Sequence, residues 1–143
     1  MVEQMFAAPD VDAPAREAEV KYLKMEDLMG RHVIIVPKQI EQREGERGTY
    51  ETITADVIVL DGRKTEKVPT LPRIERDFWV SGYNVVAELR QYVGTGTPVL
   101  GFLTTQKKAY WFDKADPDVE KAKSTLAAWE QYESQKQTQE PPF

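Results

Sequence analysis

Two short segments combine aromatic rings with basic side chains, a combination suited to binding nucleic-acid strands. Their members are Arg76, Phe78 and Trp79, and Lys107, Lys108, Tyr110 and Trp111. Bases stack on aromatic rings with about 1–3 kcal/mol each, and Lys or Arg neutralises the phosphates. Because every base has a flat face, such binding depends little on base sequence. The two segments therefore predict contacts to a single strand.

One ring of each adjacent pair is expected to be exposed and the other buried, because neighbouring residues on a strand point to opposite faces. The alternation around each pair favours Trp79 and Tyr110 as the exposed members, and Trp111 stays a candidate. Phe102 is flanked by Gly101, which would let a base come close. A place in the core is the alternative for Phe102.

Three further basic residues, Lys38, Arg43 and Arg47, lie in a segment rich in charge. The glutamates among them are Glu41, Glu44 and Glu46. The segment is interpreted as a loop beside the binding groove, where the basic residues contact phosphates, or as an ordinary solvated loop. Lys107 and Lys108 are expected at the tip of a hairpin, from which they would reach phosphates.

Enzymatic chemistry finds little support, so no catalytic residue, metal or cofactor is expected. Residues 94–97 are rich in glycine but lack the lysine and following helix of a phosphate-binding loop. The single histidine, His32, lies in an apolar run and is expected to be structural. The aspartates Asp113, Asp116 and Asp118 are explained by capping and by the dipole of a following helix.

The chain has 143 residues, no cysteine and a formal net charge of −5. This length suits one domain with its own core. The sequence shows neither a long apolar run nor the layout of a secretory signal, so a cytoplasmic protein without membrane contact is expected. Residues 25–115 hold thirteen basic and thirteen acidic side chains, and the acidic excess lies toward both ends. Composition thus permits nucleic-acid binding without arguing for it.

The elements that would position these residues are mostly strands. Strands are expected at 31–37, 49–60, 76–81, 98–105 and 109–112. The four consecutive apolar residues 33–36 predict burial on both faces, Pro37 is expected to end the first strand, and residues 38–48 are expected to form a charged loop. A helix is expected over residues 85–93. Asp116 is expected to cap a last helix with Pro117 at its first position and an apolar stripe of Val119, Ala122, Leu126 and Trp129.

Five strands with a helix between the third and fourth match the order of the oligonucleotide/oligosaccharide-binding (OB) fold. The expected fold is therefore mainly β: a five-stranded OB-fold barrel with an added C-terminal helix. Residues 1–24 are expected to be a flexible arm, residues 25–133 the domain, and residues 134–143 a disordered tail.

The sequence closes with Pro141-Pro142-Phe143 after a polar segment. A ring next to a carboxylate on a proline-stiffened tether suits a pocket with a basic rim. Bacterial single-stranded-DNA-binding proteins end similarly, with acidic residues before Pro-Phe, and recruit replication and repair proteins through that tip. The similarity implies a partner-binding tip here, and a frayed terminus is the alternative.

Four segments, taken in order, carry a further resemblance. They are residues 28–37, 54–62, 93–103 and 109–112, the last shortly before Asp116 and Pro117. Their order and spacing over residues 27–132 resemble a family of small phage proteins, mostly from phages of actinobacteria, described as single-stranded-DNA-binding. The turn before Ala109 departs from the family, in which it is often longer and rich in glycine and proline.

The resemblance implies a phage protein that coats single-stranded DNA during replication or recombination. Because one barrel offers only a short binding track, a homo-oligomer is expected. The alternative is a non-enzymatic β-barrel adaptor or structural phage protein that binds protein and not nucleic acid, which the acidic charge favours. The two differ in whether basic residues from separate segments meet on one face that also exposes a ring.

Overall fold

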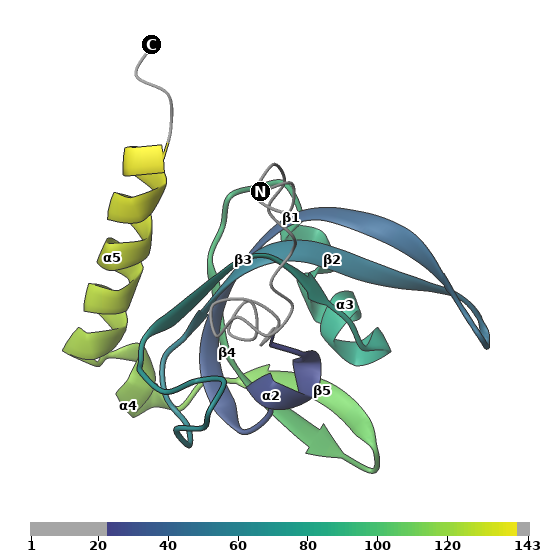
Figure 1. The fold of residues 1–143 in the computed structure, drawn as a ribbon, viewed down its shortest axis with the longest axis horizontal. Coiled ribbons are helices and arrows are strands. Elements are labelled where there is room, and N and C mark those ends of the chain that lie inside the picture. Colours follow the sequence, from purple (N-terminus) through teal and green to yellow (C-terminus); the bar gives the residue numbers. More distant parts are fainter. Residues whose placement is uncertain (1–22, 140–143) are drawn as a thin grey trace, which may run out of the picture.

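The computed structural model describes residues 23–139, with side chains to residue 135, and centres on one antiparallel sheet (Figure 1). Its strands are β1 (Arg31–Gly45), β2 (Gly48–Val59), β3 (Arg73–Val80), β4 (Val99–Gln106) and β5 (Ala109–Lys114). They pair in the order β3-β2-β1-β4-β5, so β3 and β5 lie at the edges. The mainly β fold class is thereby confirmed. Barrel closure is not shown, because no ladder joins β3 to β5 within the described residues.

The helices are short except for the last one. They are α2 (Met25–Leu28), α3 (Tyr83–Leu89), the 3-10 helix η2 (Arg90–Tyr92), α4 (Pro117–Glu120) and α5 (Lys123–Gln139). The predicted helix between the third and fourth strands is confirmed as α3 with η2. Within residues 23–139, no helix combines the length and apolarity needed to cross a membrane. The predicted Pro141-Pro142-Phe143 tip lies outside the described residues.

The predicted loop at residues 38–48 is wrong, because β1 and β2 form one long hairpin through this segment (Figure 1). The pairing continues from Val33 opposite Val59 to Gly45 opposite Gly48. Strand β1 continues past Pro37, and its pairing with β2 accommodates the proline by a register shift between Pro37 and Gln39. A bulge is one of the few places in a sheet that tolerates the missing N–H of proline.

Both faces of the sheet are buried near its centre, as the apolar run 33–36 predicted. On the inner face, β1 and β2 pack against α2 and α3 around Val33, Ile35, Val57, Val86 and Leu89. On the outer face, residues of α5 cover a second cluster that consists of Ile34, Val36, Ile58, Ala128 and Tyr132. Beyond this cover, Tyr50 and Trp79 are exposed on the outer face of the distal hairpin and β3.

The last helical region begins as predicted and then differs. The Asp116 side chain accepts a hydrogen bond from the Asp118 amide at 2.8 Å, and Pro117 is the first helical residue. The helix breaks after Glu120, however, and the predicted stripe holds only in part. Trp129 packs against the outer cluster as predicted, but Leu126 is 59% exposed, and Ala128 and Tyr132 are the buried residues of α5 in this cluster. A break resets the helical phase, which a single 3.6-residue period does not anticipate.

Ordered structure extends past both ends of the interval 25–133. Leu23 is buried in the inner core, before the predicted start at residue 25. Helix α5 continues to Gln139, beyond the predicted end at residue 133.

Candidate nucleic-acid interface

The outer face of the distal hairpin and β3 carries a stack of the half-buried Arg43 on the exposed ring of Trp79. Trp79 lies opposite Thr54 on β2, and Arg43 lies opposite Tyr50. The Arg43 guanidinium carbon is 3.6 Å from the centroid of the Trp79 ring. Trp79 is 56% exposed, and Phe78 packs against the inner core, as predicted. An arginine over a tryptophan ring is the strongest common form of cation–π contact.

Two neighbours fix the guanidinium in this position. Arg43 Nη2 lies 2.9 Å from Glu41 Oε2, and Nε donates to Thr52 Oγ1 at 3.3 Å. A planar group held in place loses little conformational freedom when a base stacks on it. Arg43 therefore offers a preorganised stacking surface, although Glu41 offsets part of its charge. We name the surface of Glu41, Arg43, Tyr50, Thr54 and Trp79 the hairpin face.

The second aromatic pair is reversed relative to the prediction. Tyr110 packs against the inner core and Trp111 is 38% exposed. Trp111 lies opposite Thr104, on the same sheet face as Phe102. Tyr110 turns inward because Gly82 leaves space for it; a Cβ on Gly82 would lie 3.2 Å from the Tyr110 Cβ. Only tertiary contact with the start of α3 decides which ring is buried.

The space beside Gly101 is occupied by protein and not open to a base. A Cβ at Gly101 would meet the Phe112 ring at 2.5 Å, so the glycine makes room for that ring. Phe102 is half-buried and packs against His32, with 4.8 Å between ring centroids. Phe102 therefore packs against His32 and belongs to neither of the two buried clusters.

Lys38 and Arg76, both predicted to contact phosphates, share a buried carboxylate instead. The Lys38 ammonium lies 2.9 Å from Asp56 Oδ1 and 2.8 Å from Asp77 Oδ1. Arg76 Nη1 lies 3.8 Å from Asp56 Oδ2, which also accepts a hydrogen bond of 2.6 Å from the Tyr132 hydroxyl. This Asp56 cluster joins β1, β2, β3 and α5, so these two basic residues serve the fold.

The pKa values in the Asp56 cluster follow from this geometry. Burial opposes ionisation of Asp56, but hydrogen bonds from Tyr132, Lys38 and the Asp77 amide outweigh it and lower its pKa below 3.8. Desolvation likewise acts to lower the pKa of Lys38, yet hydrogen bonds to Asp77 and Asp56 leave it raised above 10.5. Burial, and then the hydrogen bond to Asp56, raises the pKa of Tyr132. All three shifts favour the paired state.

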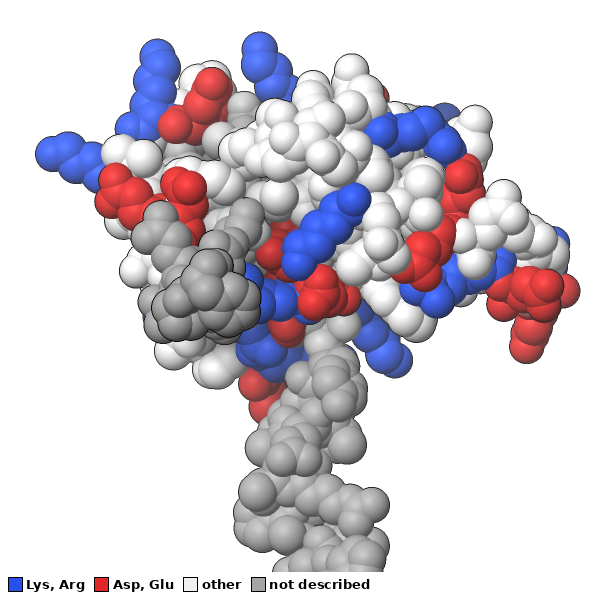
Figure 2. Space-filling view, turned by 90° about the horizontal axis from the view of Figure 1, so that it is seen from above, with Lys and Arg blue, Asp and Glu red and all other residues white. Residues whose placement is uncertain are grey.

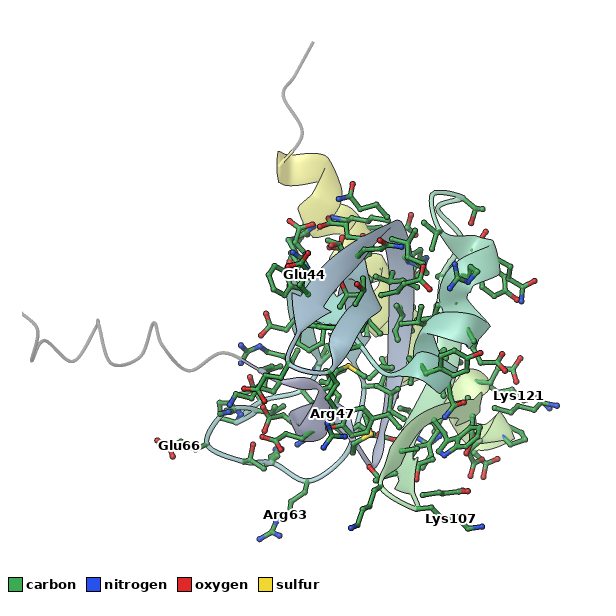
Figure 3. The ribbon with its side chains drawn as sticks, turned by 90° about the vertical axis from the view of Figure 1, so that its right-hand side faces the viewer. Glu44, Arg47, Arg63, Glu66, Lys107 and Lys121 are labelled. Carbon is green, nitrogen blue, oxygen red and sulfur yellow. The ribbon has the colours of Figure 1, made fainter. Side chains whose placement is uncertain are left out.

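Arg47, Lys107 and Lys108 differ from these residues, because no carboxylate of the described residues forms an ion pair with them. Arg47 lies at the tip of the β1–β2 hairpin, and the lysines form the β4–β5 turn. Figure 3 shows Lys107 pointing away from the body of the protein. The charges of these three side chains are therefore not neutralised by a described carboxylate.

The lysine turn has a strained backbone. Gln106 pairs with Ala109, so Lys107 and Lys108 form a two-residue connection, and their φ angles are +50° and +65°. Turns with two positive φ angles favour Asn-Gly, and other residues cost about 1–3 kcal/mol each in such conformations. Two lysines therefore sit where the backbone would prefer neither.

The charged groups only partly meet on one face. Segments 38–47 and 73–76 come together around Asp56 and Trp79, next to an exposed ring. The Lys107–Lys108 turn lies beyond the start of β1, at the end of the sheet away from the hairpin tip. In the view of Figure 2, basic side chains lie among acidic ones and form no single patch. The electrostatic attraction for a polyanion is therefore local.

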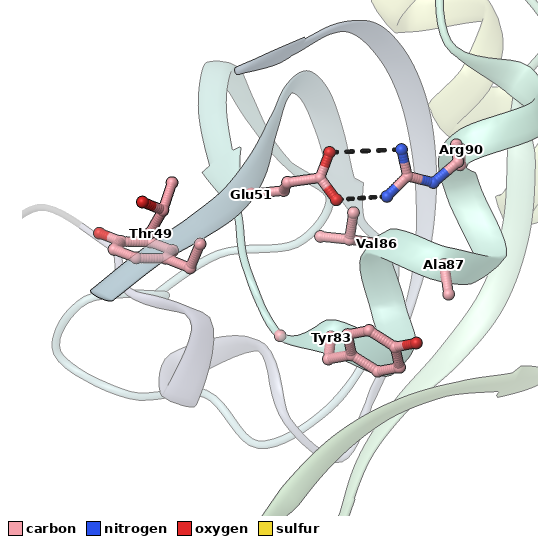
Figure 4. A pocket seen from close by; sticks show the side chains of 8 residues that line it. Thr49, Glu51, Tyr83, Val86, Ala87 and Arg90 are labelled. Carbon is pink, nitrogen blue, oxygen red and sulfur yellow. Dashed lines mark hydrogen bonds and ion pairs between the residues drawn. The ribbon is translucent and has the colours of Figure 1, made fainter. Parts of the chain in front are cut away.

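A groove that the sequence did not indicate lies between the hairpin and α3 (Figure 4). Its volume is about 520 Å³, and its lining includes Thr49, Tyr50, Glu51, Tyr83, Val86 and Arg90. Arg90 makes two hydrogen bonds to the Glu51 carboxylate, which lower the pKa of Glu51 and raise that of Arg90. Tyr83 is 87% exposed. The groove could not be predicted from the sequence pattern, because Glu51 and Arg90 are far apart in the sequence and meet only in the folded protein.

His32 is fully engaged in structural hydrogen bonds. Its Nδ1 lies 2.8 Å from Asp61 Oδ2, and its Nε2 accepts a hydrogen bond of 3.1 Å from the Asp116 amide. Asp61 Oδ1 also accepts from the His32 amide at 2.7 Å. Among the described residues, no group of three or more His, Asp or Glu could hold a metal ion. His32 therefore ties β1 to the turn after β2 and to the start of α4.

The geometry defines a mainly β protein whose antiparallel sheet carries an arginine–tryptophan stack on its outer face. No protein-family model, curated protein or solved structure matches the chain.

Proposed function

We propose that this protein binds single-stranded DNA through the hairpin face. The observation that carries the proposal is the Arg43–Trp79 stack, which is held by Glu41 and Thr52 and in which Trp79 is 56% and the Arg43 side chain 24% exposed. A base that stacks here gains a ring surface and a cation at once. Arg47 at the hairpin tip and the Lys107–Lys108 turn supply phosphate contacts.

We further propose that the sheet is an OB-fold. The order β3-β2-β1-β4-β5 with α3 between β3 and β4 supports this assignment. The amide of Asn84 near the start of α3 is 3.5 Å from the Tyr110 carbonyl of β5, so α3 lies beside the edge that closure would use. OB-folds bind oligonucleotides on the face of their second and third strands, where Trp79 and Thr54 lie.

The proposed role is to coat DNA strands, as the resemblance to phage proteins implies. Stacking without base-edge readout makes binding largely independent of sequence. One sheet covers few nucleotides, so several copies would line one strand, and the Pro141-Pro142-Phe143 tip would recruit partner proteins. Replication and recombination are the processes that expose such strands.

Anisotropy of a labelled oligo-dT, titrated at two salt concentrations beside a duplex of equal length, tests the proposal. We expect saturable binding to the single strand that weakens as salt rises, with weaker binding to the duplex. Absence of binding at low salt would refute the proposal.

Replacing the strained turn with asparagine and glycine (K107N/K108G) is expected to change stability and binding in opposite directions. Removing the strain should raise the free energy of unfolding by about 1–3 kcal/mol. Loss of the two charges should weaken oligo-dT binding and reduce the slope of log affinity against log salt by about 0.7 for each lost phosphate contact. Urea denaturation and anisotropy measure the two effects.

The matched control is K121Q/K123Q, which removes two exposed charges from the α4–α5 region. It should leave the salt slope unchanged. An unaltered slope in K107N/K108G as well would show that the turn does not contact phosphate.

A second candidate function is a non-enzymatic adaptor that binds protein. It is favoured by an apolar groove of about 210 Å³ between α5 and β4, where Leu126 is 59% exposed. It is also consistent with the use of Lys38 and Arg76 inside the fold. The oligo-dT titration separates the two functions, because an adaptor would not bind the oligonucleotide.

A further inference from the structure

Tyr83 presents a large aromatic ring at the first residue of α3 and is 87% exposed. It borders the groove between the hairpin and α3, whose apolar members include Val86 and Ala87 (Figure 4). The groove volume of about 520 Å³ falls within the range typical of small-molecule sites. A ring left in solvent beside such a groove has surface available for a ligand.

The groove and the hairpin face lie on opposite sides of β2 and meet at its edge, at Tyr50, beyond the last residue of β2 that pairs with β3. Tyr50 lies opposite Arg43 in the hairpin register, and it also lines the groove. Gly45 leaves room for the Tyr50 ring, since a Cβ there would lie 3.1 Å from the ring edge. A strand stacked on Trp79 and Arg43 would therefore turn around the edge of β2 at Tyr50 before it reaches Tyr83.

The remaining groups of the groove suit the edge of a base. The Glu51 carboxylate accepts hydrogen bonds and the Arg90 guanidinium donates them, and their ion pair joins the hairpin to the end of α3. Both side chains are partly exposed, at 38% and 54%. A planar ligand with apolar faces and a polar edge matches this arrangement of ring, apolar wall and ion pair.

We propose that this groove holds a second base of the bound strand, stacked on Tyr83. The inference rests on the proposed function and extends it from one stacking position to two. The bound strand then runs from the hairpin face past Tyr50 into the groove, so the binding track is longer than the hairpin face alone.

The test compares oligo-dT of about 4 and about 16 nucleotides, the limits of site size for one OB-fold. In Y83A, affinity for the longer oligonucleotide should fall by about tenfold, while affinity for the shorter one should stay within about twofold, because it needs only the hairpin face. Y83F keeps the ring and should bind like wild type. E88A alters an exposed residue of α3 outside the groove and is the matched control.

The outcomes distinguish the two levels of the proposal. Equal affinity of Y83A and wild type for both lengths, with wild type binding, would overturn the groove assignment and leave the hairpin face intact. A loss shared by Y83A and E88A would also overturn it. Failure of wild type to bind either oligonucleotide would overturn the proposed function, and the groove assignment with it.

Discussion

Replacing Trp79 with alanine is expected to weaken oligo-dT binding by about 5- to 150-fold, the range given by 1–3 kcal/mol for one stacked base. The change removes the ring itself and also the surface that supports Arg43, 3.6 Å above it. Because Trp79 is 56% exposed, the free energy of unfolding should change by less than about 1 kcal/mol. Anisotropy and urea denaturation measure the two quantities.

Two variants make this result specific. W79F keeps an aromatic face and should retain most of the affinity. W111A removes a tryptophan that is 38% exposed on another strand pair and should have a smaller effect. If W111A weakened binding as strongly as W79A, the hairpin face would not be the main stacking surface.

Asp56 is expected to give the largest loss of stability. It is 1% exposed and pairs with Lys38, Arg76 and Tyr132. Breaking a buried charged cluster on one side costs about 3–5 kcal/mol. We expect D56A to lose about 3 kcal/mol, near the lower limit, because Lys38 is 42% exposed and partly regains hydration. Y132F should lose about 1–3 kcal/mol, since it removes one hydrogen bond to the carboxylate.

Urea denaturation measures the stability losses of D56A and Y132F. Y83F is the control for Y132F, because it also removes one tyrosine hydroxyl, but from an exposed side chain. The D56A result would contradict the account if the loss were below about 1 kcal/mol. A double variant with K38M should lose less than the sum of the single variants, because both remove the same ion pair.

The Asp56 cluster also predicts how stability depends on pH. The pKa of Asp56 is lower in the folded protein than its ordinary value of 3.8. Its contribution is therefore present above about pH 4 and is lost as pH falls through the folded pKa. D56N should show a shallower loss of stability than wild type as the pH falls below about 4, measured by urea denaturation at a series of acidic pH values. An equal slope of stability against pH in D56N and wild type would indicate that other carboxylates dominate the loss of stability at low pH.

The fold was predictable where burial sets the pattern. The apolar run 33–36, the helical spacing of Val85, Val86 and Leu89, and the Asp116 cap each carry their own local signal. The distal hairpin was not predictable in this way. Its residues are mostly polar, and its strands are held by their ladder to each other and to β3.

The candidate site was predictable only in part. Trp79 follows from the alternation on one strand, whereas the choice between Tyr110 and Trp111 depends on Gly82. The roles of Lys38 and Arg76 depend on Asp56, which is 18 and 20 residues away in the sequence. The groove at Tyr83 needs the hairpin and α3 to be side by side. Each feature that the sequence did not predict depends on a contact between segments that are distant in the chain.

Tryptophan fluorescence of the W111F/W129F variant, in which Trp79 is the one remaining tryptophan, tests the central claim most directly. Titration with oligo-dT should quench this fluorescence saturably, with the same midpoint as the anisotropy of the labelled strand, and both midpoints should shift together as salt rises. Binding without quenching would place the DNA elsewhere on the protein. If oligo-dT at low salt neither bound to the protein nor quenched its fluorescence, this result would contradict the proposed function itself.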